Sequence, residues 1–140
     1  MIEPPIVKFS KWVSWSKRHD MLVEELLFPG VYLLARFKRA PKGHGNPTQK
    51  EIVYIGETCN NDLKGRLQQF DRSASKNKLA HSGGSSYHKK FNKPDSHLYL
   101  SIYPAKKVWT LNPLFIRHVE REIILKYALK YGKQPELNKK

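Results

Sequence analysis

The chain lacks the features that define several common protein classes. Its 140 residues include one cysteine, Cys59, which excludes an intrachain disulfide and a cysteine-rich zinc site. No apolar run approaches the roughly 18 residues that a membrane-spanning helix needs, and the N-terminus lacks the apolar stretch of a signal peptide. The sequence therefore predicts one domain, residues 1–140, in a cytoplasmic protein.

Acidic residues are also scarce. Asp and Glu total 12 against 26 Lys and Arg, which gives a formal net charge of +14. Such an excess repels itself in a compact protein and favours polyanionic partners such as nucleic acid. The hydrophobic residues, 39% of the chain, are sufficient for a buried core, so we expect a folded basic domain.

The apolar patterning predicts an α+β domain. Apolar residues recur with helical spacing near both ends of the chain and once in the middle, and three β-branched stretches have the pattern of strands. The expected helices are one or two short ones within residues 8–28, a short one that carries Leu63, Leu67 and Phe70 after an Asn61 or Asp62 cap, and one over residues 114–131. The expected strands cover residues 31–37, 52–56 and 97–103, and the first two are close enough in sequence to form an antiparallel hairpin.

Two polar stretches are expected to be irregular. Residues 38–50 form a basic loop inside the predicted hairpin. Residues 73–96 are rich in Ser, Gly, Lys, Asn and His, and we expect at most one helical turn there. A segment of that length without regular structure is usually functional or mobile.

Glu120 is the anomalous acid of the chain. At about 100° per residue it falls on the apolar arc of the last helix, among Ile116, Val119 and Ile123. Glu122 lies on the opposite side, where Lys126 can pair with it. A carboxylate against an apolar face needs a cation, a metal or a hydrogen-bond network, so Glu120 is either half of a buried salt bridge or a site residue.

Two tyrosines flanked by glycine form a second unusual feature. They occur as Gly30-Val31-Tyr32 and Tyr54-Ile55-Gly56 on the first two predicted strands. Tyrosines in strands usually pack across the sheet. Here they are followed by an arginine on a short helix, an inward glutamate on a late helix and an asparagine near the end of the chain.

In this ordered set the chain resembles the GIY-YIG nuclease superfamily. The motifs that carry the resemblance are GVY (30–32), VYIGET (53–58), LKGRL (63–67), EREII (120–124) and PELN (135–138). The resemblance covers residues 29–138 and leaves residues 1–28 as an N-terminal helical extension. It implies a three-stranded antiparallel sheet flanked by helices, and a divalent-metal-dependent endonuclease that hydrolyses DNA, with Mg²⁺ or Mn²⁺ as cofactor.

The resemblance also implies roles for particular residues. Glu120 is the expected metal ligand, Arg66 the residue that stabilises the phosphate in the transition state, and Asn138 a brace of the site. Tyr32 is expected to position or deprotonate the attacking water, with a phenol made more acidic by nearby cations, and Tyr54 to hydrogen-bond near the phosphate. His81, in a stretch similar to the homing-endonuclease branch of the family, is a further catalytic candidate.

The chain departs from the family pattern at two places. The basic loop makes the spacing between Tyr32 and Tyr54 longer than usual, and Phe70 stands where many members have a histidine one turn after the arginine. Phosphate contacts are expected mainly from the basic residues of the two polar stretches, which are Lys38, Arg39, Lys42, Lys50, Lys76, Lys78, Lys89, Lys90 and Lys93.

Other functions find less support in the sequence. The Gly-rich run at residues 82–86 lacks the Gly-Lys-Ser/Thr ending of a P-loop. His118 faces the polar side of the last helix, so we interpret it as a surface residue. Cys59 has no activating partner in sequence, so we interpret it as a small packing residue. The main alternative is a catalytically weak nucleic-acid-binding module that keeps the same fold. RNA as substrate, a homodimer, and a partner that supplies specificity all stay open.

Overall fold

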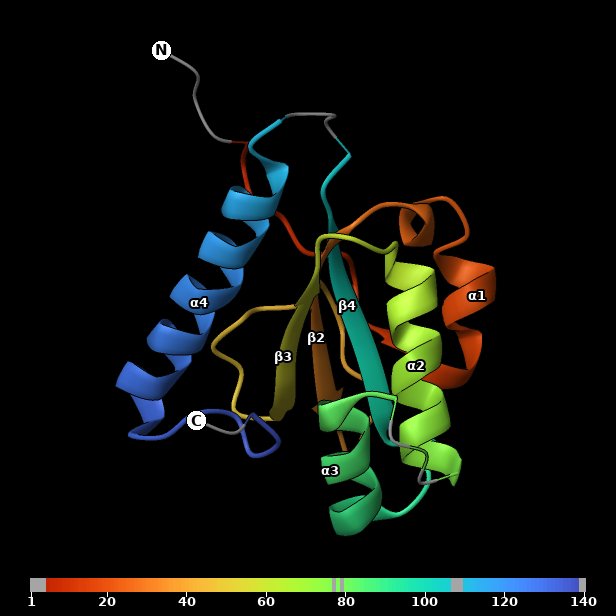
Figure 1. Cartoon of the computed structure of the whole chain (residues 1–140). Helices are drawn as coiled ribbons and strands as arrows, with labels where there is room; N and C mark the ends of the chain where they lie inside the picture. The colour runs from red at the N-terminus through yellow and green to blue at the C-terminus, as the bar shows by residue number, and fades with distance from the viewer. Residues whose placement is uncertain (1–4, 77, 79, 107–109, 139–140) are drawn as a thin grey trace.

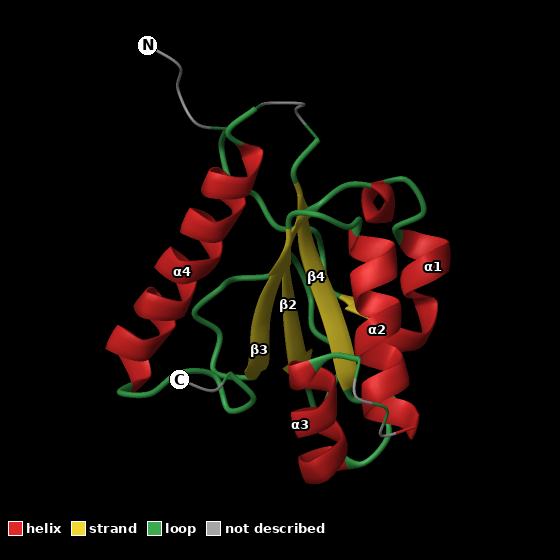
Figure 2. Ribbon diagram, in the orientation of Figure 1, coloured by secondary structure: helices red, strands yellow, loops and turns green. Residues whose placement is uncertain are grey.

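The computed structural model describes residues 5–76, 78, 80–106 and 110–138. Within them the chain forms an antiparallel sheet with helices on both sides (Figures 1 and 2). The strands are β1 (Val13–Ser14), β2 (Gly30–Arg36), β3 (Ile52–Thr58) and β4 (Leu98–Pro104). The helices are α1 (Arg18–Met21), α2 (Leu63–Lys76), α3 (Ser82–Phe91) and α4 (Asn112–Tyr131), with short 3-10 turns η1 (Trp15–Lys17) and η2 (Glu25–Leu27).

The sheet has four strands in the order β1-β4-β2-β3. The predicted hairpin is confirmed, because β2 and β3 pair antiparallel with Tyr32 opposite Gly56. The third predicted strand is also confirmed as β4, which pairs with the other edge of β2. The expectation of three strands is wrong by one, since Val13 and Ser14 add β1 to the outer edge of β4.

The N-terminal segment is less helical than predicted. Residues 5–14 contain no helix and only the two-residue strand β1, and short helical turns follow between residues 15 and 27. Phe9 and Trp12 are buried on one side of the sheet and Val13 and Trp15 on the other. The segment thus contributes to both layers of the core, and this two-sided burial produced the closely spaced apolar residues that resembled a helical pattern.

The sheet separates two hydrophobic layers. Helices α1, α2 and α3 lie against one face and α4 lies against the other (Figure 1). Along β2 the side chains alternate, so that Tyr32 and Leu34 enter the first layer and Val31 and Leu33 the second. No helix among the described residues is both long and apolar enough to cross a bilayer.

Residues 73–96, expected to be irregular, contain the end of α2 and the whole of α3. Asp62 caps α2 by accepting a hydrogen bond from the Gly65 amide at 2.7 Å, as predicted, but the helix continues to Lys76. A second helix, α3, spans Ser82–Phe91, whereas at most one turn was expected; residues 77 and 79 lie outside the described residues. Tertiary packing here overrides the weak helix propensity of Gly83 and Gly84.

Gly84 is tightly enclosed between α3 and α2. A Cβ at this position would lie 2.6 Å from both the Phe70 carbonyl oxygen and the Ser73 Cβ. Gly84→Ala is therefore expected to destabilise the protein by about 1–3 kcal/mol, because overpacking against backbone outweighs the gain of roughly 1 kcal/mol in helix propensity. Urea unfolding of this variant and of Lys89→Ala, an exposed change on the same helix, checks the prediction. Equal midpoints would contradict it.

The last helix follows the sequence prediction closely. It begins at Asn112 with Pro113 in its first turn, and it ends before Gly132, which adopts a left-handed φ of 76°. Glu122 is exposed and pairs with both Lys126 and His118. The predicted surface positions of Glu122 and His118 are therefore confirmed.

Candidate active site

Tyr32 and His81 form a buried polar pair at the centre of the candidate site. Tyr32 lies in the middle of β2 and is 0% exposed, and His81, which precedes α3, is 3% exposed. The Tyr32 hydroxyl lies 2.7 Å from His81 Nε2. Burial, with a smaller contribution from the Arg66 charge, lowers the pKa of His81 to about 3. His81 is therefore neutral at physiological pH.

The other ring nitrogen of His81 fixes its tautomer. His81 Nδ1 accepts a hydrogen bond from the Gly84 amide at 3.2 Å, which caps the N-terminus of α3. A neutral imidazole carries one proton, so that proton is on Nε2 and is donated to the Tyr32 hydroxyl oxygen. The hydroxyl of Tyr32 keeps its own proton for another acceptor.

Tyr54 lies beside Tyr32 and is the tyrosine that reaches the surface. It is on β3, and its ring centroid lies 6.1 Å from that of Tyr32. A Cβ on Gly56 would lie 2.5 Å from the Tyr32 hydroxyl, and one on Gly83 would lie 2.7 Å from the Tyr54 ring. These two glycines permit the close packing that holds the two tyrosines side by side.

Arg66 completes this network from the first turns of α2. It is half-buried and donates a hydrogen bond to the Gln69 side chain at 2.7 Å. Its charge acts on Tyr32, Tyr54 and His81. The structure thus brings Tyr32, Tyr54, Arg66 and His81 together although they come from four different segments.

The expected acidity of Tyr32 is wrong for the protein as it stands. Burial raises the pKa of the Tyr32 phenol well above its usual value, and the neighbouring Arg66 offsets this only in part. The pKa of Tyr54 is also raised, again mainly by burial. Both phenols are therefore neutral hydrogen-bond donors rather than bases at physiological pH.

Glu120 lies on the other side of the β3 edge, on the inward arc of α4. It is half-buried, and within the described part of the chain it forms no salt bridge or hydrogen bond. Burial, together with the neighbouring Glu57 carboxylate, raises the pKa of Glu120 to about 7. The neighbouring Arg121 charge lowers this pKa only in part. Among the described residues no salt bridge to Glu120 is formed, so the structure does not support its interpretation as half of a buried salt bridge.

A cleft connects Glu120 with Tyr54. It has a volume of about 740 Å³ and lies between α3 and α4, with the C-terminal segment at one end. Its polar lining consists of Tyr54, Ser82, Ser86, Glu120, Arg121, Gln134 and Asn138. Because Tyr32 is fully buried behind Tyr54, the cleft-facing hydroxyls are those of Tyr54 and the two serines.

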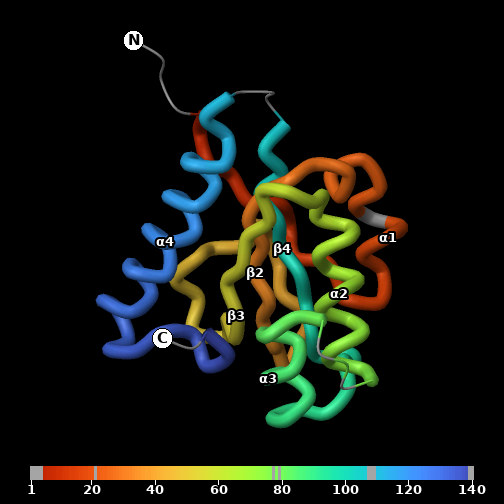
Figure 3. Tube along the Cα trace, in the orientation of Figure 1, coloured from red at the N-terminus to blue at the C-terminus, as the bar shows by residue number. Residues whose placement is uncertain are grey.

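Asn138 attaches the end of the described chain to the free edge of β3. Its side chain donates to the Ile55 carbonyl at 2.8 Å and accepts from the Ile55 amide at 2.9 Å. The Leu137 amide adds a bond to the Val53 carbonyl at 2.8 Å. Figure 3 shows this last segment running back beside β3. The side chain therefore satisfies the backbone groups next to Tyr54 that an edge strand leaves unpaired.

The donor set suits a hard divalent cation held by few protein ligands. Among the described residues, no group of three His, Cys, Asp or Glu side chains could hold a metal. Mg²⁺ commonly keeps several waters and takes one or two carboxylates plus substrate phosphates. The Glu120 carboxylate, with that of Glu57 near it and the side-chain oxygens of Tyr54, Ser82 and Ser86 in the same cleft, fits that habit. Among the described residues Glu120 could therefore hold such an ion.

The pKa of Glu120 predicts a pH-dependent cost of folding. The pKa of Glu120 in the folded protein is about 7, above the usual 4.5. The contribution of Glu120 to the free energy of unfolding is therefore most favourable below about pH 4.5, and it falls as the pH rises to 7. Allowing for solvent at a half-buried carboxylate, Glu120→Gln should be more stable than the parent by about 1–2 kcal/mol at pH 8. Urea unfolding at pH 5 and 8 checks this.

The same measurement with Mg²⁺ tests the metal assignment without any assay of activity. Added Mg²⁺ should stabilise the parent at pH 8 and leave Glu120→Gln unchanged, because a cation that binds only the folded state shifts the unfolding equilibrium. Equal stabilisation of both proteins would show that the cation binds elsewhere.

The structure does not bring the nine predicted phosphate-binding cations into the cleft. None of them lines it, and all are exposed. Lys89 and Lys90 are on α3, whose serines do line the cleft, and Lys90 pairs with Glu136. The loop cations, Lys38, Arg39, Lys42 and Lys50, lie on a segment held by bonds from Gly45 to Ser10 and from Trp12 to Gln49. The loop is therefore anchored to the N-terminal segment.

Sequence reasoning missed several residues of the cleft and its surroundings. Arg121 is adjacent to Glu120, and Glu57 follows Gly56 in a motif already singled out. Strand alternation with Ile55, which packs on the α4 side, could have placed Glu57 near Glu120. Ser82 and Ser86 lie four residues apart, but this spacing has meaning only once α3 is known to be a helix.

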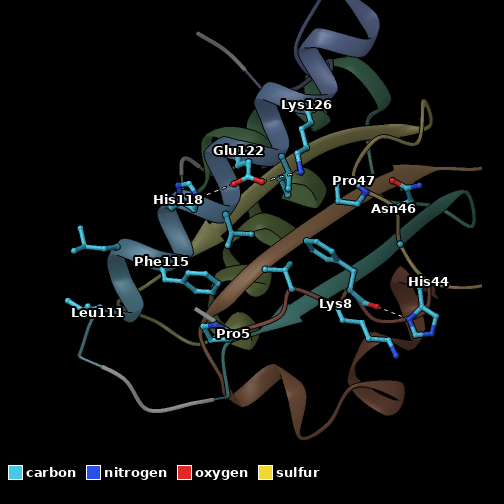
Figure 4. A pocket seen from close by; sticks show the side chains of 16 residues that line it. Pro5, Lys8, His44, Asn46, Pro47, Leu111, Phe115, His118, Glu122 and Lys126 are labelled. Atoms are coloured by element: carbon cyan, nitrogen blue, oxygen red, sulfur yellow. Dashed lines mark hydrogen bonds and ion pairs between the residues drawn. The ribbon is translucent and has the colours of Figure 1, made fainter. Parts of the chain in front are cut away.

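A second hollow lies on the other flank of α4. It has a volume of about 940 Å³ and is lined mainly by apolar side chains of the N-terminal segment and of α4, among them Phe9, Phe115 and Val119. Figure 4 shows that its acid, Glu122, is bonded to His118 and Lys126. Because the Glu122 carboxylate is already paired, it is a poorer metal ligand than the Glu120 carboxylate of the cleft.

Cys59 is a packing residue, as expected. It is half-buried beside the α4 layer, and its thiol lies 2.8 Å from Glu57 Oε2. Burial and this carboxylate raise the pKa of the thiol to about 12, so it is not a nucleophile at neutral pH.

Comparison with known proteins gives no family for this chain. No family model, no curated protein and no solved structure matches it.

Proposed function

We propose that the protein is a divalent-metal-dependent endonuclease of the GIY-YIG type, which hydrolyses phosphodiester bonds in DNA. One observation carries the proposal: a half-buried carboxylate without a salt bridge, Glu120, shares a cleft with Tyr54, which packs beside the hydrogen-bonded pair of Tyr32 and His81 and is acted on by the charge of Arg66. A structural core gains nothing from such a set, because unpaired charge and buried polar groups are costly.

The order of the elements supports the GIY-YIG assignment without establishing it. The two tyrosines lie on adjacent antiparallel strands, the arginine on the next helix and the glutamate on the last helix. In this proposal β4, β2 and β3 form the core sheet and β1 is an addition from the N-terminal segment. The basic loop lengthens the hairpin beyond the end of the paired region, so the register of Tyr32 opposite Gly56 is kept.

Each residue of the cleft has a distinct task in this proposal. Glu120 holds the metal, which supplies Lewis-acid stabilisation of the phosphate and a more acidic bound water. The Tyr54 hydroxyl donates a hydrogen bond to a phosphate oxygen, and Tyr32 orients it. Arg66 supplies positive charge behind the tyrosine pair, and His81 holds Tyr32 by the Nε2 proton. Asn138 keeps the edge of β3 in place.

The charge of the molecule supports nucleic acid as the substrate. A net charge of +14 favours a polyanion, and each phosphate neutralised by Lys or Arg adds roughly −0.9 to the slope of log affinity against log salt on duplex DNA. DNA is the proposed substrate and RNA the alternative. If the domain alone does not distinguish DNA sequences, a second copy of the chain or a partner protein supplies that specificity.

Two observations favour a second candidate, a binding module without catalysis. Tyr32 is fully buried and neutral, and the expected histidine one turn after Arg66 is Phe70. A module that only binds DNA needs no general base. In that case the cleft holds a phosphate and releases it unchanged.

Cleavage assays on several DNA structures separate the two candidates. Supercoiled plasmid and a set of branched and gapped oligonucleotides are incubated with Mg²⁺, Mn²⁺ or EDTA, and binding is measured on the same substrates. Cutting that requires the metal supports the nuclease. Salt-sensitive binding with no cutting of any substrate in either metal supports the binding module.

A further inference from the structure

The cleft extends along α4 beyond Glu120, and its outer part has no role in the proposed chemistry. Two exposed side chains of α4 line it, Arg121 and Leu125, next to the half-buried Ile124 and Ala128. Among the described residues Arg121 forms no salt bridge or hydrogen bond, and its charge acts on the neighbouring Glu120. Leu125 is 57% exposed. An exposed cation and a large exposed apolar side chain, both at the wall of one cleft, suit a ligand that is anionic at one end and apolar at the other.

The two walls of this outer part face each other with different chemistry. Arg121 and Leu125 are four residues apart on α4, so they lie on one face of the helix. Ser82 and Ser86 have the same spacing on α3 and line the opposite wall. A phosphate can therefore be bound between the guanidinium and a hydroxyl while a flat apolar group packs on the leucine.

A nucleotide has this combination of groups, but only when it is unpaired. In a double helix the base faces are covered by stacking, and the backbone presents mainly phosphates and sugars. An unpaired base can turn a face toward an apolar or aromatic side chain. A volume of about 740 Å³ is in the range of small-molecule sites, which suits one or two nucleotides rather than the width of a duplex.

Resting on the proposed function, we propose that the outer cleft is a subsite for one unpaired nucleotide next to the scissile phosphate. Arg121 and Ser86 bind the phosphate of that nucleotide, and Leu125 packs against its base. The substrate class is then DNA with an unpaired nucleotide at the cut site, such as a gap or a flap, in preference to intact duplex.

Helix α4 provides a matched control for each of the two residues. Arg117 is exposed one turn before Arg121, and Leu129 is 76% exposed one turn after Leu125. Neither lines the cleft. Arg117→Ala removes the same charge as Arg121→Ala, and Leu129→Ser makes the same chemical change as Leu125→Ser at a more exposed position, so net charge and composition are matched.

The test measures binding in a Glu120→Gln background, so that cutting does not interfere. Fluorescence anisotropy compares a labelled duplex with the same duplex carrying a two-nucleotide gap, over a series of salt concentrations. We expect the gapped DNA to bind more tightly. Arg121→Ala should weaken it several-fold and reduce the log–log salt slope by about 0.9. Leu125→Ser should weaken the gapped DNA roughly fivefold and leave the intact duplex unchanged.

Three results would overturn the inference: equal binding of gapped and intact DNA, equal effects of Arg121→Ala and Arg117→Ala, or equal effects of Leu125→Ser and Leu129→Ser. The nuclease proposal is tested separately, by cutting with Glu120 intact. If no DNA is cut while the differences between the matched variants persist, the subsite stands and the nuclease fails. If the parent cuts DNA and the variants do not differ, the subsite alone fails.

Discussion

Glu120→Gln is expected to lower metal-dependent DNA cleavage by at least about 10³-fold while the protein stays folded. The change removes the unpaired carboxylate of the cleft and keeps its size and its position on α4. The helix itself should tolerate it, because the apolar arc of α4 is held by Ile116, Val119, Ile123 and Tyr127. Loss of activity together with equal or greater stability identifies Glu120 as a residue of the site.

Glu122→Gln is the matched control for this variant. Glu122 is on the same helix, is exposed, and pairs with His118 and Lys126. Fully exposed pairs of this kind contribute little to stability because solvent screens them, so neither stability nor cleavage should change much. Plasmid nicking by both variants, purified in the same way as the parent, is the measurement. Equal loss in the two variants would contradict a specific role for Glu120.

Tyr54→Phe and Tyr32→Phe are expected to differ in kind. Tyr54→Phe removes the hydroxyl that faces the cleft and should lower the cleavage rate by about 10²-fold. Its effect on stability should be small, since water in the cleft can replace the lost group. Tyr32→Phe leaves the buried His81 Nε2 proton without an acceptor, and this should destabilise the protein by about 1–3 kcal/mol in addition to slowing cleavage.

Cleavage rates and urea unfolding on the same two variants check this difference. The pH dependence adds a further readout, because the protein holds His81 neutral and both phenols protonated. The cleavage rate should therefore show no pH dependence near neutral pH that comes from a tyrosine acting as a base. If Tyr32→Phe proved as stable as the parent, the bond from His81 would be unimportant to the fold.

The strands and the last helix could be predicted because local sequence and burial agree there. Val31 and Leu33 alternate with Tyr32 across β2, and Leu98 and Leu100 share a face of β4. Pro113 and Gly132 mark the two ends of α4 by backbone chemistry alone. In these elements tertiary contacts reinforce local preference, so pattern and structure coincide.

Helix α3 could not be predicted for the opposite reason. Its first turn contains Gly83 and Gly84, which weaken an isolated helix. The structure requires them there, because a Cβ at Gly84 would meet the backbone of α2 and a Cβ at Gly83 would meet Tyr54. The reason for these glycines is a contact between segments distant in sequence, and no local pattern records such a contact.

The position of Glu120 in the candidate site could be predicted from the sequence, but the residues around it could not. Helical periodicity alone placed Glu120 on the apolar arc of α4, and the structure leaves it half-buried. The burial of Tyr32, its bond from His81 and the cleft position of Arg121 depend on how β2, α3 and α4 pack together. The role of Tyr32 changes accordingly, from an acidic phenol to a buried donor that orients Tyr54.

Nicking of supercoiled plasmid by the parent protein and by Glu120→Gln, with Mg²⁺ and with EDTA, tests the nuclease proposal most directly. We expect nicked and linear products only from the parent with Mg²⁺, and unchanged DNA binding by the variant. Products of equal yield from Glu120→Gln, or no products from the parent on plasmid and on gapped DNA alike, would contradict it.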